Sequence, residues 1–89
     1  MRLDLFLKSS RLCSRRTVAQ KMCEARLVSV NDNPAKSSTT VKPGDEVLIR
    51  RRDRLTRVRV LALPTSRQTS RGEAGTLYEV LSEDKLATD

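Results

Sequence analysis

Histidine is absent from this sequence, and cysteine occurs only at Cys13 and Cys23. A structural zinc site needs about four nitrogen or sulfur ligands, which these residues cannot supply. Neither cysteine has a CxxC spacing or a visible base to activate it, so we expect both to be reduced residues that pack helices together. The sequence also lacks a P-loop, a GxGxxG motif and a nucleophile elbow. It therefore predicts no enzyme and no bound metal or cofactor.

Aromatic residues are almost as scarce, with one phenylalanine, one tyrosine and no tryptophan. Proteins that bind single-stranded RNA stack the bases on aromatic side chains, so this class of protein is disfavoured. Long apolar runs are missing too, and no segment could span a bilayer. Arg2, Asp4 and Lys8 interrupt the only candidate for a signal peptide, so we expect a cytoplasmic protein without a membrane anchor.

Positive charge is what the chain has in excess, with 18 basic against 11 acidic residues and a formal net charge of +7. Seven of the 18 basic residues fall within the first 26 positions, where Asp4 and Glu24 are the only acids. Such a concentration of like charge repels itself unless an anionic partner relieves it. We expect nucleic acid to be that partner, although an anionic membrane surface or a heparin-like polymer would also fit the charge.

Two helices are predicted, over residues 2–12 and 15–25, because apolar residues recur there at three- and four-residue spacing. Ser14 is the expected N-cap of the second helix. The short link between them predicts a compact αα-hairpin. The expected buried stripes are Leu3, Phe6, Leu7 and Ser10 on the first helix, and Val18, Ala19, Met22 and Cys23 on the second.

Strands follow the helices, because the pattern changes to a period of two. We expect strands over residues 27–30, from Ala35, over 46–50 and over 55–63, with turns at 31–34 and 42–45. Residues 1–63 should form one domain, 64–76 a flexible loop, 77–81 a closing strand and 82–89 an acidic disordered tail. The predicted fold class is α+β, with a two-helix hairpin packed on a small, mostly antiparallel sheet.

The basic residues form two clusters. The first, on the helices, comprises Arg2, Lys8, Arg11, Arg15 and Arg16; it could bind phosphates or could simply be solvated. Asp4, in the first turn of the first helix, could complement the helix dipole or hold Arg2 or Lys8 in place. The second cluster, between Arg50 and Arg59, has only Asp53 within it, and could either contact phosphates or protect an edge strand from aggregation. Structured RNA suits these residues better than DNA, because the second helix has few Asn or Gln side chains to read base edges.

Several segments together resemble the S4 RNA-binding domain family. They are RLDLFL at residues 2–7, Ser10-Arg11, SRRTVAQ at 14–20, VSVND at 28–32, AK at 35–36 and VKPGDEV at 41–47. The resemblance covers residues 2–50 in unbroken order. It implies an S4-type (alpha-L) fold, with residues 1–63 as the S4 domain.

Among small stand-alone S4 proteins, the chain is most similar to those of bacterial ribosome-associated quality control. The resemblance implies a cytoplasmic, monomeric factor that binds 23S rRNA and peptidyl-tRNA on a large subunit holding a stalled chain, while a nascent-chain tailing factor adds alanine. Arg2 and Arg16 match RNA-contacting arginines of the family. The implied RNA-binding set is Arg2, Lys8, Arg11, Ser14, Arg15, Arg16 and Lys36, with Arg50, Arg51, Arg52 and Arg54 as a secondary set.

One residue departs from the family pattern: Arg26 stands where members usually have glycine. If this position needs a positive φ, arginine would cost about 1 kcal/mol there. Two other functions stay open. The first is recycling of free large subunits with stranded chains, as implied by the related heat-shock S4 proteins. The second is a basic protein-interaction module that binds an acidic partner.

Overall fold

The computed structural model describes residues 1–64 and 70–86 of the chain. Its helices are α1 (Leu3–Ser9), α2 (Arg16–Glu24) and α3 (Arg71–Thr76). Its strands are β1 (Val28–Val30), β2 (Asn33–Pro34), β3 (Glu46–Arg50), β4 (Arg54–Val60) and β5 (Tyr78–Lys85). None of the helices in these two ranges is long and apolar enough to cross a membrane.

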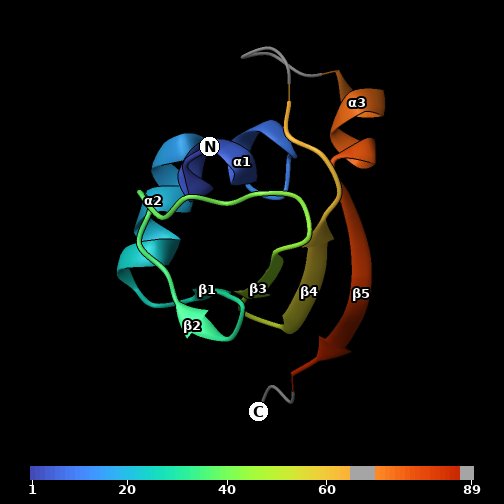
Figure 1. The fold of residues 1–89 in the computed structure, drawn as a ribbon. Helices are drawn as coiled ribbons and strands as arrows, with labels where there is room; N and C mark the ends of the chain where they lie inside the picture. The colour runs from blue at the N-terminus through green and yellow to red at the C-terminus, as the bar shows by residue number, and fades with distance from the viewer. Residues whose placement is uncertain (65–69, 87–89) are drawn as a thin grey trace.

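The strands form one sheet in the order β2-β1-β3-β4-β5, and each neighbouring pair is antiparallel. The α1–α2 hairpin packs on one side of this sheet (Figure 1). Phe6 and Leu7 of α1 are fully buried, in one cluster with Val47, Ile49 and Val58 of the sheet. The predicted α+β class, with a helical hairpin on an antiparallel sheet, is confirmed.

The second helix differs from the prediction at both of its ends. Ser14 does not cap it, because the helix begins at Arg16 and its N-cap residue is Arg15, which makes no side-chain capping bond. At the other end Arg26 has φ +60°, and its N–H donates to the carbonyl oxygen of Cys23 at 3.0 Å. The N–H of Leu27 donates to Met22 at 2.9 Å, which completes a Schellman cap. Arg26 therefore has the positive φ that the usual glycine at this position of the family suggested.

The stripe predicted for α2 is right for Ala19 and Cys23, which are buried, and wrong for Val18, which is 38% exposed. The helix contains nine residues and its apolar side is correspondingly narrow. A residue one position away from Ala19 lies about 100° around the helix axis, so it turns out of a narrow contact.

Two turns of the sheet follow the predicted chemistry. Asn31 and Asp32 have φ +50° and +68° and form a two-residue hairpin loop between β1 and β2. The return strand therefore starts at Asn33, and the prediction that it begins at Ala35 is wrong because the loop is shorter than expected. Gly44 has φ +96°, and the buried carboxylate of Asp45 accepts from the Lys42 N–H at 3.0 Å.

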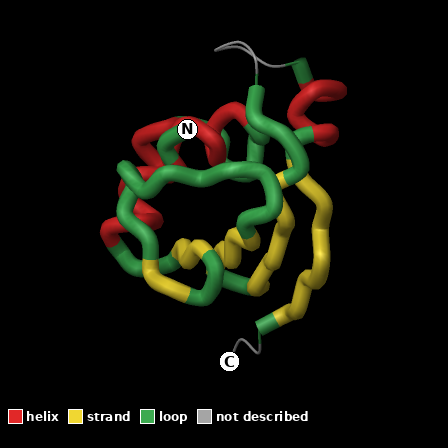
Figure 2. Tube along the Cα trace, in the orientation of Figure 1, coloured by secondary structure: helices red, strands yellow, loops and turns green. Residues whose placement is uncertain are grey.

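The long connection between β2 and β3 crosses the helical hairpin, as the green loop in Figure 2 shows. Its backbone holds the start of α1: the N–H of Leu3 donates to Thr39 at 2.8 Å, and that of Asp4 to Ser37 at 3.1 Å. These bonds satisfy two N–H groups that have no partner inside the helix. The loop therefore fixes the entry of the chain into α1.

The segment predicted as a flexible loop, residues 64–76, contains a helix. Ser70 caps α3 by accepting from the N–H of Glu73 at 3.2 Å. A serine followed three residues later by glutamate is a recognised start signal, which the prediction overlooked because two glycines weaken the helical pattern. Residues 65–69 of the predicted loop lie outside the described residues.

The closing strand is longer than predicted. β5 continues to Lys85, so residues 82–85 belong to the sheet and not to the acidic tail. The reason is long-range pairing: β4 offers an open edge along its whole length, and Glu83 of β5 accepts from Arg54 of β4 at 3.2 Å. Residues 87–89 of the predicted tail lie outside the described residues.

Candidate nucleic-acid interface

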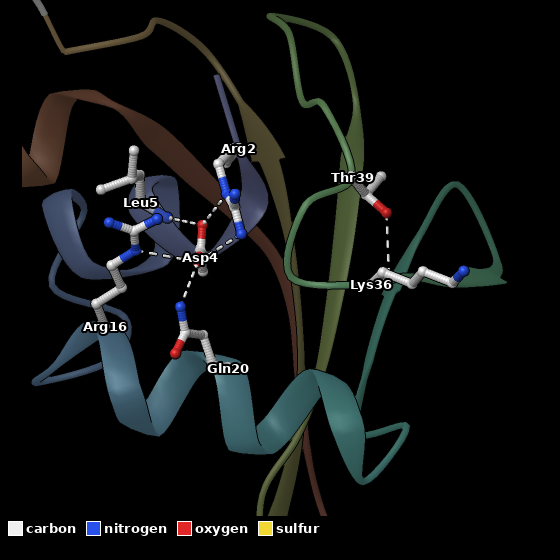
Figure 3. Close-up of polar contacts among 7 residues, drawn as sticks. All are labelled: Arg2, Asp4, Leu5, Arg16, Gln20, Lys36 and Thr39. Atoms are coloured by element: carbon white, nitrogen blue, oxygen red, sulfur yellow. Dashed lines mark hydrogen bonds and ion pairs between the residues drawn. The ribbon is translucent and has the colours of Figure 1, made fainter.

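One buried carboxylate joins the two helices at the basic end of the hairpin. Asp4 has no solvent-exposed side-chain surface, and its Oδ2 accepts from Arg16 Nε at 3.1 Å and from Gln20 Nε2 at 2.9 Å. Its Oδ1 accepts from Arg2 Nε at 3.2 Å and from the Leu5 N–H at 2.8 Å. Figure 3 shows Arg2, Arg16 and Gln20 converging on this carboxylate from different parts of the chain.

The surroundings of Asp4 keep it ionised. Burial by itself would raise the pKa of Asp4, but hydrogen bonds from Gln20, Arg16, Arg2 and the Leu5 N–H outweigh it and lower that pKa below the ordinary 3.8. A buried charge is tolerated when it is paired and hydrogen-bonded in this way. At neutral pH Asp4 is therefore an anion that fixes the positions of two cations.

Both cations stay accessible. The side chains of Arg2 and Arg16 are 46% and 44% exposed, although each points its Nε toward Asp4. A guanidinium carries five N–H donors in a planar fork, so the remaining donors can meet a phosphate oxygen pair. Because the fork is already oriented, binding loses less side-chain entropy than it would with a free arginine.

The prediction that Asp4 could hold Arg2 is confirmed. Among the described residues, its hydrogen-bond partners do not include Lys8, the alternative that the sequence suggested. Arg16 and Gln20 were missed as partners of Asp4. The spacing of Arg16 and Gln20 could have indicated this, because residues four apart lie on one face of a helix and can reach the same acceptor.

The other predicted RNA-binding residues lie on the same helices, in the link between them and in the loop that holds α1. Lys8 is exposed in the last turn of α1, Arg11 and Ser14 are exposed in the link between the helices, and Arg15 is the exposed N-cap residue of α2. Lys36 is exposed in the loop that holds α1, and its N–H donates to Thr39 Oγ1 at 3.0 Å. In Figure 3 the Lys36 side chain extends away from Asp4. Arg2 and Arg16 are thus the pair that the fold brings together.

The arginines of β4 have acidic partners that the sequence did not reveal. Arg57 pairs with Asp32 at 3.3 Å and with Glu46 at 3.2 Å, and Arg54 pairs with Glu83 at 3.2 Å. The hydrogen bonds to Glu46 and, next in size, to Asp32 raise the pKa of Arg57. The inference that Asp53 alone opposes this cluster is wrong, because cross-strand neighbours lie far away in the sequence.

Arg51 of the predicted secondary set turns toward the protein. Its Nη2 donates to the carbonyl oxygen of Leu12 at 2.8 Å, so it ties the turn after β3 to the link between the helices. Burial raises the pKa of the neighbouring Cys13 thiol, and the charge of Arg51 opposes that rise. Arg51 therefore has a structural bond that neither Arg50 nor Arg52 makes among the described contacts.

Both cysteines are free thiols and both are buried, in agreement with the prediction that they are reduced packing residues. The Sγ of Cys13 lies 3.7 Å from the Sδ of Met22. Burial, with smaller effects of Asp4 and Cys13, raises the pKa of Cys23 to about 11. Since a nucleophilic cysteine needs its thiolate form, Cys23 is suited to packing.

Comparison of the sequence with known families finds the S4 domain over residues 1–47. A protein of Bacillus subtilis (strain 168) named RQC P-site tRNA stabilizing factor is 45% identical over 86 residues, which cover 97% of this chain and 98% of that relative. A protein of the same name from Halalkalibacterium halodurans is 45% identical over 87 residues, covering 98% of this chain and 97% of the relative.

Comparison of the fold with solved structures finds two similar proteins. Heat Shock Protein 15 of Vibrio cholerae, described as trimeric, superposes with a TM-score of 0.82 at 28% identity, over 92% of this chain and 82% of that one. The solution structure of the hypothetical protein HP1423 superposes with a TM-score of 0.80 at 29% identity, over 92% and 98% of the two chains.

Proposed function

Because the chain belongs to the family of RQC P-site tRNA stabilizing factors, which carry an S4 domain, we propose that it stabilises tRNA in the P site during ribosome-associated quality control. In this proposal it binds a large ribosomal subunit that still holds a stalled peptidyl-tRNA. It contacts 23S rRNA and the tRNA, and so supports the addition of a C-terminal alanine tail by a separate tailing factor.

One observation carries the proposal: the buried carboxylate of Asp4 positions the half-exposed guanidiniums of Arg2 and Arg16 side by side. Charge-assisted bonds from arginine to phosphate are among the strongest hydrogen bonds that proteins make, and a planar fork can form two of them at once. Two pre-oriented forks on adjoining helices suit a run of backbone phosphates. They suit structured RNA, since the protein has few aromatic side chains on which to stack free bases.

The remaining predicted residues extend this site around the pair. We assign Lys8, Arg11, Ser14 and Arg15 to contacts with the same RNA from the helical side, and Lys36 to contacts from the loop that holds α1. The factor acts in the cytoplasm as a monomer. Its own contribution is binding, and the chemistry of tailing belongs to its partner.

A second candidate is a heat-shock S4 protein function, in which the factor recycles free large subunits with stranded chains. The likeness to Heat Shock Protein 15, with a TM-score of 0.82, supports it. The sequence identity there is 28%, whereas the relatives named as P-site tRNA stabilizing factors reach 45%. We therefore favour the first function.

Sedimentation of the tagged protein through a ribosome gradient tests the proposal. The protein should travel with free large subunits that carry peptidyl-tRNA, and less with intact translating ribosomes. An equal distribution over monosomes and polysomes would contradict it. Absence from all ribosomal fractions would favour a basic protein-interaction module instead.

A further inference from the structure

A groove with three arginines lies at the carboxyl end of α2, away from the Asp4 centre. Its volume is about 410 Å³, and it is lined by Leu27, Arg50, Arg51, Arg52 and Leu86. Backbone hydrogen bonds fix its walls: Arg50 N–H donates to Leu27 at 2.8 Å, and Arg51 N–H donates to Arg54 at 2.8 Å. The arginines lie beyond residues 1–47, so they are not part of the matched S4 sequence.

Within residues 1–64 and 70–86, no acidic side chain forms an ion pair with the arginines that line this groove. In the two described ranges, neither Arg50 nor Arg52 forms an ion pair, and both are exposed. Arg51 is held by the Leu12 carbonyl oxygen, which is a neutral acceptor. Three neighbouring positive charges in one groove destabilise the free protein by mutual repulsion, and a bound anion removes that repulsion.

A fourth arginine stands next to the groove in a strained conformation. Arg26 directly precedes the wall residue Leu27 and has φ +60°, which glycine adopts much more readily than arginine. Its side chain is exposed and makes no hydrogen bond or ion pair within the described part of the chain. Glycine would close the same Schellman cap at lower cost, so the fold alone does not explain arginine here. Strain of this kind concentrates where a side chain serves binding.

We propose that Arg26, Arg50 and Arg52 form a second phosphate-binding site for structured RNA, with Arg51 fixed as the floor of the groove. The inference rests on the proposed function and extends it. Arg16 and Arg26 are ten residues apart, which is a rise of about 15 Å along a helix.

Structured RNA fits these observations better than an acidic peptide does. One rigid element, α2, carries Arg16, a partner of Asp4, at its start, and Arg26 follows its C-cap residue, so a single stiff polyanion can reach both sites. An acidic peptide bound in the groove would leave the phosphate site at Arg2 and Arg16 unexplained. Arg26 stands where family members usually have glycine, so this chain carries one more positive charge at that position. This charge lies next to the groove, because Arg26 directly precedes its lining residue Leu27.

Two sets of variants test the proposal, with affinity measured for purified large subunits loaded with a P-site tRNA. The double variant Arg50→Ala/Arg52→Ala should weaken binding on the order of tenfold at about 0.1 M salt. It should also reduce the slope of log K against log salt by about 1.8, because each lost phosphate contact contributes about 0.9. The matched control is Arg57→Ala/Arg59→Ala, which removes the same charge from residues paired with acids and should change binding much less.

Arg26→Gly gives the sharper result, because its two effects have opposite directions. It should raise the melting temperature by relieving the strained φ, and weaken binding severalfold by removing a charge. Unchanged RNA affinity in both Arg26→Gly and Arg50→Ala/Arg52→Ala, alongside a clear loss in Arg16→Ala, overturns the second site and leaves the proposed function intact. If the groove variants lose an acidic protein partner but keep their RNA affinity, the site belongs to a protein and the inference is also wrong. Failure of the wild-type protein to bind the loaded subunit would instead overturn the proposed function.

Discussion

Replacing the buried carboxylate by its neutral isostere, Asp4→Asn, should both destabilise the protein and weaken RNA binding. In the wild type the Leu5 N–H donates to Oδ1 of Asp4 at 2.8 Å, and the carbonyl oxygen of asparagine can still accept this bond. The new NH₂ group, however, would take the place of Oδ2 and face the N–H donors of Arg16 and Gln20. In the wild type these donors lie 3.1 and 2.9 Å from Oδ2. Two favourable contacts thus become unfavourable ones.

The size of the effect follows from the exposure of the partners. A hydrogen bond to a charged group contributes about 1.5–3 kcal/mol when it is buried. The bond from Arg16 contributes less, because solvent screens a side chain that is 44% exposed. We expect a total loss of about 2 kcal/mol in the free energy of unfolding, which lowers the Tm of a small domain by about 8–16 °C. Asp53→Asn, at a side chain that is 71% exposed, should cost less than about 0.5 kcal/mol.

RNA affinity distinguishes this account from a simple charge effect. Both variants make the protein more positive by one charge, which by itself strengthens binding to a polyanion. We expect Asp53→Asn to bind as well as the wild type or better, and Asp4→Asn to bind about fivefold more weakly, since Arg2 and Arg16 lose their fixed orientation. Urea unfolding and equilibrium RNA binding measure the two effects. Tighter RNA binding by Asp4→Asn, or a stability equal to that of Asp53→Asn, would refute the reasoning.

Acid should remove the contribution of Asp4 to stability, because folding lowers its pKa. That contribution is complete above the ordinary value of 3.8 and disappears as the pH falls through the lowered pKa. The free energies of unfolding of the wild type and Asp4→Asn, measured in urea, should therefore become equal at such acid pH. Arg51→Ala should lose about 1 kcal/mol of stability with its bond to Leu12, measured by thermal unfolding; an unchanged Tm would contradict this. Arg2→Ala and Arg16→Ala should each weaken subunit binding by about 1–3 kcal/mol while circular dichroism stays native, and retained affinity would exclude them from the interface. If about five phosphates are contacted, log K should fall with log salt at a slope of about −4 to −5, and a slope near zero would remove the electrostatic account.

Local patterns in the sequence predicted the helical hairpin and several strands well. The spacing of Leu3, Phe6 and Leu7 predicted a buried face, and all three are fully buried. The strand expected over residues 46–50 is β3 with the same bounds. These elements could be predicted because periodicity and turn residues act over only a few positions.

Contacts between distant residues were harder to predict. Gln20 meets Asp4 across sixteen positions, and Arg51 meets Leu12 across thirty-nine. The extension of β5 to Lys85 depends on its pairing with β4, because an acidic segment alone has little strand propensity. The sequence suggested that Asp4 could hold Arg2, whereas the contacts of Arg16 and Gln20 with the same carboxylate emerged only from the fold.

The central claim is that the Asp4-oriented pair of arginines binds a large subunit in a manner that depends on P-site tRNA. The most direct measurement is the equilibrium affinity of the purified protein for large subunits with and without a P-site tRNA, for the wild type and for Arg16→Ala. We predict that the tRNA strengthens wild-type binding and that Arg16→Ala loses most of its affinity for the loaded subunit. Equal wild-type affinity for loaded and empty subunits, or Arg16→Ala binding as tightly as the wild type, would contradict the account.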